Sequence, residues 1–129
     1  MAAITVLAVD WAVPDGRLRQ ALENEPELAI IALAPKTQLL DLDLNKLRPD
    51  VLVLRLGEIH DLELLPRLRN SYRRLRAVVV LPQTDTPWLY QALKAGAQGV
   101  ISDRLSGENL AAAIRAVHAG GAFISGEAS

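Results

Sequence analysis

Five short aliphatic runs, separated by segments with helical spacing, constrain the fold of this 129-residue chain more than any other feature. The runs cover residues 4–9, 28–33, 51–54, 77–81 and 99–102. Each run is too short for a typical helix and lacks strict alternation with polar residues, which is the pattern of strands covered on both faces. The runs therefore predict five buried strands.

Between the runs, apolar residues recur at the three- or four-residue spacing that is typical of helices. The spacing predicts five helices, built around Leu18 and Leu22; Leu39, Leu40, Leu44 and Leu47; Leu62, Leu65, Leu68 and Tyr72; Leu89, Ala92 and Leu93; and Leu110, Ala113, Ile114 and Val117. Pro87 suits the first turn of the fourth helix, and Ser106 can cap the fifth. Right-handed helical crossovers join parallel strands, so we predict an α/β fold with a doubly wound, five-stranded parallel sheet.

Composition excludes several classes of protein. The net charge of −1 gives the whole chain no electrostatic affinity for nucleic acid or an anionic membrane. Without cysteine the chain has neither disulfides nor thiolate metal sites, and no apolar run approaches the length of a membrane span. We expect a single domain in a cytoplasmic protein that is not an enzyme and needs no metal or cofactor.

Function in such a sheet is expected at the carboxyl ends of the strands. The third aliphatic run, in PDVLVLRLGE, ends at Arg55, an arginine directly after four apolar residues. An isolated arginine is costly to bury, so its position needs an explanation. The plain one is that its stem packs on the sheet while its charge reaches water.

Three segments of the sequence resemble the receiver (CheY-like) domain of two-component response regulators of the NarL/LuxR type. They are PDVLVL, AVVVLPQTDTPWLYQALKAGAQGVIS and SGENLAAAIRAVHAGGAFIS. The resemblance covers nearly the whole chain and implies a flavodoxin-like sheet with strand order 2-1-3-4-5. It assigns residues 1–125 to the domain and residues 126–129 to the start of a linker.

The chemistry of the resembled family is phosphoryl transfer to an aspartate that ends the third strand. In this sequence that position falls on Arg55, which can be neither a carboxylate nucleophile nor a magnesium ligand. Of the acidic pair after the first strand only Asp10 remains, because Trp11 takes the second place. The positions of the switch hydroxyl, the switch aromatic residue and the lysine fall on Pro82, Val100 and Asp103.

These substitutions suggest a second explanation for Arg55. Its guanidinium would pair with Asp103, Asp10 or both, in the space that the ion and the phosphoryl group fill in the family. The chain is then a pseudo-receiver that acts without phosphorylation, as a protein-interaction and dimerisation module in transcriptional regulation. We expect DNA to be bound only by a C-terminal helix-turn-helix domain outside this chain.

We expect a homodimer formed by the fifth helix, with Leu110, Ile114 and Val117 as candidate contacts, because the helix is more apolar than one buried stripe requires. The arginines of PRLRNSYRRLRA are interpreted as a solvated helix face with some acid pairing. His60 and His118 show no metal-ligand spacing and are expected at the surface.

Two alternatives to this function stay open. The vacated acidic pocket, roofed by Trp11 or Trp88, could hold a small molecule that the domain senses. Alternatively, another acid such as Glu58 or Asp61 could accept the phosphoryl group.

Overall fold

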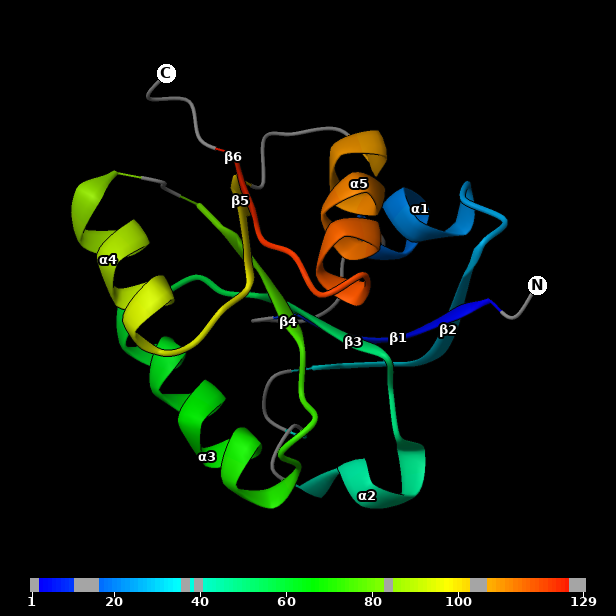
Figure 1. The fold of residues 1–129 in the computed structure, drawn as a ribbon, viewed down its shortest axis with the longest axis horizontal. Coiled ribbons are helices and arrows are strands. Elements are labelled where there is room, and N and C mark those ends of the chain that lie inside the picture. Colours follow the sequence, from blue (N-terminus) through cyan, green and yellow to red (C-terminus); the bar gives the residue numbers. More distant parts are fainter. Residues whose placement is uncertain are drawn as a thin grey trace.

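A single parallel sheet forms the centre of the molecule in the computed structural model, which describes residues 3–10, 17–35, 38, 41–82, 85–102 and 107–125 (Figure 1). Its strands are β1 (Ile4–Asp10), β2 (Leu28–Pro35), β3 (Val51–Arg55), β4 (Ala77–Leu81), β5 (Gly99–Ser102) and β6 (Phe123–Ser125). All neighbouring strands run parallel, in the order β2-β1-β3-β4-β5-β6. The parallel α/β sheet and the order of its first five strands are confirmed.

The prediction of five strands was wrong, because the described chain contains a sixth. In β6 only Phe123 and Ile124 are large and apolar, so the strand gives no aliphatic run in the sequence. Pairing alone defines it, since Phe123 lies opposite Gly99 and Ile124 opposite Val100 at the edge of the sheet.

Helices cover both faces of the sheet, as predicted. They are α1 (Arg17–Glu23), α2 (Leu44–Leu47), α3 (Leu64–Ser71), α4 (Thr86–Lys94) and α5 (Gly107–His118), with a 3-10 turn, η2 (Ile59–Glu63), before α3. One core lies between the sheet and α1 with α5, and the other lies between the sheet and the remaining helices (Figure 1). Because all the described strands run parallel, their carboxyl ends lie at one edge of the sheet.

Local signals explain where several helices begin and end. Asp85 caps α4 by accepting a hydrogen bond from the Trp88 backbone N–H, and Pro87 lies in the first turn as predicted. The second helix is a single turn that Asp43 caps and that ends at Arg48, whose backbone is left-handed with φ of 49°. The predicted cap of α5 at Ser106 lies outside the described residues.

Candidate functional site at the carboxyl edge of the sheet

Arg55 and Asp10 form the centre of the candidate site. Each is the last residue of its strand, and the two face each other in the register of the neighbouring strands β3 and β1. Both strands are almost wholly buried, and the burial extends to their final residues. The sheet topology alone therefore brings together two charges that are 45 positions apart in the sequence.

The two side chains form a buried ion pair. The Arg55 Nη1 atom donates to both carboxylate oxygens of Asp10, at 3.2 Å to Oδ2 and 3.4 Å to Oδ1. Arg55 is 7% exposed and Asp10 1% exposed, and each makes a further interaction besides this one. The predicted pairing of Arg55 with Asp10 is confirmed, and the interpretation of Arg55 as a side chain that reaches water was wrong.

Burial makes each charge dependent on the other. Desolvating either ion alone costs several kcal/mol, and removing one partner of a buried pair typically costs about 3–5 kcal/mol. The guanidinium therefore occupies the end of β3 as a fixed positive charge.

The remaining predicted site residues lie around this edge or outside the described chain. Pro82 follows β4 directly and is half-buried, without a backbone N–H to offer. Val100 is fully buried in β5, in the core below α3 and α4. Trp11 and Asp103 fall outside the described residues, so the predicted pair of Arg55 with Asp103 stays a prediction.

The prediction that Leu110, Ile114 and Val117 form a dimer contact needs correction. All three are buried in the monomer, at 4%, 0% and 1% exposure, in the core that α1 and α5 share with the sheet. The fifth helix is unusually apolar because α1 packs beside it, so α5 buries a second stripe inside its own chain. These side chains are not available to a partner.

Sequence reasoning missed a cluster in η2 and the residues before it. Glu58, His60 and Asp61 each offer a metal-ligating atom, and these atoms lie within 4.8 Å of one another. His60 Nε2 lies 2.9 Å from Glu58 Oε2 and 3.9 Å from Asp61 Oδ1. The spacing of these three residues is not a recognised ligand motif, but the 3-10 turn brings together side chains of the types that bind divalent cations.

Ser102 is a second residue that the sequence did not single out. It ends β5, is 2% exposed and is partnered, so it contributes a buried hydroxyl at the carboxyl edge. The sequence did contain a signal for this residue, because Ser102 is the only polar residue of the aliphatic run 99–102.

Comparisons with known proteins identify the fold and the relatives of this chain. No family model matches it. The transcriptional regulatory protein UhpA of Salmonella typhimurium is 32% identical over 125 residues, which is 94% of this chain and 62% of that protein. The structure of a LuxR-family two-component response regulator from Aurantimonas superposes on this chain with a TM-score of 0.80 at 21% identity. The superposition covers 96% of this chain and 91% of the Aurantimonas chain.

The isolated receiver domain of RcsB from Salmonella enterica serovar Typhimurium gives a TM-score of 0.77 at 19% identity, over 95% of this chain and 94% of that one. The chain is similar in sequence to UhpA and has the fold of the receiver domains of response regulators. The chain spans about three fifths of the length of the curated relatives that it matches. Within its described residues, no helix is both long and apolar enough to span a membrane.

Proposed function

We propose that this receiver domain transmits its signal without phosphorylation at the end of β3, as a pseudo-receiver within a response regulator. The observation that carries the proposal is the buried ion pair of Arg55 with Asp10. It places a permanent cation where the resembled family has its phosphoacceptor carboxylate, and it engages the remaining acid of the family's magnesium pair. A guanidinium cannot form an acyl phosphate.

The signal would then be carried by protein contacts. UhpA is named a transcriptional regulatory protein, and this chain is similar to it over 94% of its own length. This supports a role in transcription, in which DNA is bound by a helix-turn-helix domain outside this chain and the receiver domain sets the association of the regulator. Such a domain has no phosphotransfer activity of its own.

Intact-mass measurement after incubation with a small phosphodonor and Mg²⁺ tests this proposal. We expect no phosphoryl adduct on the wild-type chain, whereas a phosphorylatable receiver treated in parallel gains one. An adduct that disappears in Glu58→Gln or Asp61→Asn would instead show that another acid accepts the phosphoryl group, and would refute the proposal.

We further propose that the domain forms a homodimer, and that α4 supplies the contact in place of the buried face of α5. Tyr90 and Leu93 are three residues apart on α4, so they share one side of the helix, and they are 60% and 44% exposed. Large exposed apolar side chains grouped on one helix are typical of interaction surfaces.

Light scattering of the wild type and of Tyr90→Ser/Leu93→Ser tests the dimer. We expect a dimer for the wild type at high micromolar concentration and a monomer for the variant. A monomeric wild type at that concentration, or a variant that still dimerises, would contradict the assigned contact. Ile31→Ser is a matched control, because Ile31 is an exposed apolar residue of β2 away from α4.

A further inference from the structure

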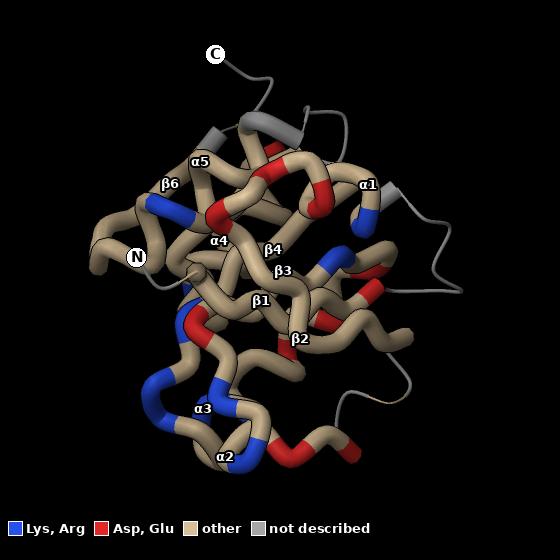
Figure 2. The backbone as a smooth tube through the Cα atoms, turned by 90° about the vertical axis from the view of Figure 1, so that its right-hand side faces the viewer, with Lys and Arg blue, Asp and Glu red and all other residues tan. Residues whose placement is uncertain are grey.

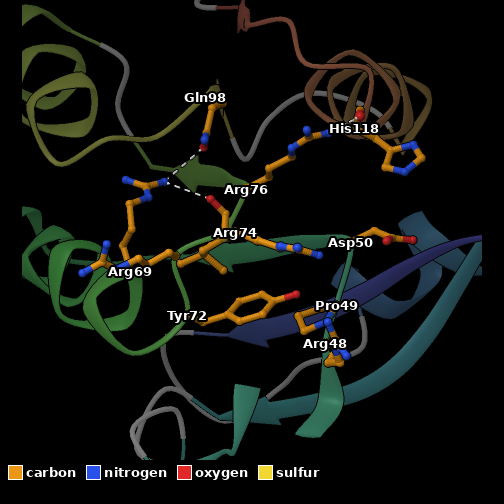
Figure 3. Close-up of a pocket in the computed structure, with 11 residues that line it drawn as sticks. Arg48, Pro49, Asp50, Arg69, Tyr72, Arg74, Arg76, Gln98 and His118 are labelled. Atoms are coloured by element: carbon orange, nitrogen blue, oxygen red, sulfur yellow. Dashed lines mark hydrogen bonds between the residues drawn. The ribbon is translucent and has the colours of Figure 1, made fainter. Parts of the chain in front are cut away.

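A basic pocket lies at the opposite edge of the sheet from Arg55, around the segments that precede β3, β4 and β5 (Figure 3). Its volume is about 740 Å³. Five arginines line it, against one aspartate: Arg48, Arg69, Arg73, Arg74 and Arg76, with Asp50. The chain as a whole has a net charge of −1, so positive charge is strongly concentrated at this edge.

Two of the five arginines hold the fold together. Arg69 donates to the carbonyl oxygens of Ala95 at 3.5 Å and Gly96 at 2.9 Å, which follow the last turn of α4. Arg76 donates to the carbonyl oxygens of Val117 and His118 at the end of α5, as Figure 3 shows for His118. Both guanidiniums thus satisfy the carbonyls and oppose the negative end of a helix dipole. The interpretation of this segment as a face with acid pairing was wrong for these two residues.

The other three arginines are in excess of what the fold requires. Arg48, Arg73 and Arg74 are exposed, and the structure records no side-chain hydrogen bond or ion pair for them among the described residues. Asp50 offsets only one of the five positive charges, and its Oδ2 atom is held by a hydrogen bond from the Thr5 backbone N–H at 2.9 Å. Figure 2 shows the basic positions gathered around α2 and α3. Three guanidinium groups therefore face solvent around one concave pocket.

Guanidinium groups bind phosphoryl oxygens through two parallel N–H donors, which makes arginine clusters suited to phosphorylated ligands. The volume of this pocket falls in the range of about 300–1,000 Å³ that is typical for small-molecule sites. The half-buried ring of Tyr72 adds an aromatic group to the lining, next to Pro49. Size and donor set together favour a small polyanion over an extended one.

We propose that this pocket binds a small anion that carries two or more adjacent phosphoryl groups, such as a nucleoside triphosphate or inorganic triphosphate. Arg73 and Arg74 supply the binding donors, with Arg48 across the pocket, while Arg69 and Arg76 keep its walls in place. The site lies at the amino edge of the sheet, so it is separate from the edge at which receivers are phosphorylated. Its occupancy would bias a domain that phosphorylation does not control.

Isothermal titration calorimetry of the 129-residue chain with inorganic triphosphate and with ATP tests the site at low salt. We expect saturable binding to the wild type and an affinity weaker by at least about tenfold in Arg73→Gln/Arg74→Gln, since two charge-assisted contacts are lost. Arg67→Gln is the matched control, because Arg67 is an exposed arginine of α3 outside the pocket. It should bind like the wild type.

The two ligands also separate the sources of the phosphoryl groups. Tighter binding of ATP than of inorganic triphosphate would indicate a nucleotide whose base contacts Tyr72, and equal affinities would indicate an inorganic polyphosphate. Both results support the site. It is refuted if neither ligand binds at millimolar concentration, if Arg67→Gln weakens binding as much as the double variant, or if duplex DNA at equal phosphate concentration displaces the triphosphate.

Discussion

The two edges of the sheet use arginine in opposite ways. At the carboxyl edge a single arginine, Arg55, is buried and paired with Asp10 at 3.2 Å. At the amino edge five arginines surround an open pocket, and the only acid among the lining residues is Asp50. The first edge is electrically balanced, whereas the second carries an excess of positive charge.

Burial explains the difference. A charge removed from water must be matched by a partner, so the carboxyl edge tolerates its arginine only together with an acid. Solvent screens the charges at the amino edge, so arginines can accumulate there at little cost to stability. Arg55 therefore stabilises the fold, whereas Arg73 and Arg74 are available to bind a ligand.

The largest effect is expected at the carboxyl edge. Arg55→Ala leaves the Asp10 carboxylate buried without its cation, so the free energy of unfolding should fall by about 3–5 kcal/mol. Urea denaturation at neutral pH measures the change. Arg67→Ala, which removes an exposed arginine, should change the free energy by no more than about 0.5 kcal/mol.

A double-mutant cycle with Asp10→Ala separates pairing from packing. Because the acid is then no longer stranded, the double variant should lose less stability than the sum of the two single variants. Additive losses would mean that the two side chains stabilise the fold independently, and the contrast between the two edges would then not rest on their pairing.

An intermediate effect is expected at the amino edge for Arg69, one of the two arginines there that support the fold. Arg69→Ala removes hydrogen bonds to three carbonyl oxygens and to the Gln98 side chain, and should cost about 2 kcal/mol in unfolding free energy. Urea denaturation again gives the value. Arg73→Ala, from the same edge, should unfold like the wild type, and an equal loss in both variants would contradict the division of the arginines into two roles.

A substitution at Gly96 tests the structural role of Arg69 without changing a charge. Its φ is +98°, and a Cβ atom there would lie 2.0 Å from Arg69 Nη1. Gly96→Ala should therefore destabilise the domain by about 1–2 kcal/mol, partly through backbone strain and partly by displacing the Arg69 guanidinium. In an Arg69→Ala background the same substitution should cost less, as measured by the same denaturation curves.

The smallest effect is expected for a charged pair that is exposed on both sides. Arg115 of α5 pairs with Glu27, and the pKa of Glu27 is lowered from its ordinary 4.5 by a backbone hydrogen bond at Glu27 and by the hydrogen bond and charge of Arg115. A carboxyl with a lowered folded-state pKa stabilises the fold above its unfolded pKa, and this contribution is lost as the pH falls through the folded value.

Glu27→Gln should therefore be slightly less stable than the wild type at neutral pH and equal to it in acid. Thermal melting across that pH range measures the difference. A gap between the two proteins that widens as the pH falls would have the wrong sign for this pair.

The outline of the fold and half of the carboxyl-edge site could be predicted from the sequence. The aliphatic runs fixed five strands because a strand covered on both faces must be apolar along its length. The topology of a parallel sheet then placed Arg55 beside Asp10, since the carboxyl ends of neighbouring strands meet. β6 was missed because its pairing with β5 defines it and its composition does not.

Periodicity and strand order are local or topological properties, so five of the six strands and the candidate partners of Arg55 could be predicted from the sequence. The sequence left open whether Arg55 pairs with Asp10, Asp103 or both. The covering of the second apolar stripe of α5 by α1 is visible only in the three-dimensional packing. It buries Leu110, Ile114 and Val117 inside the monomer. The same packing gathers arginines from before β3 and before β4 around one pocket. Which neighbour covers a helix face, and which exposed charges share a cavity, depends on packing between elements that no single segment encodes.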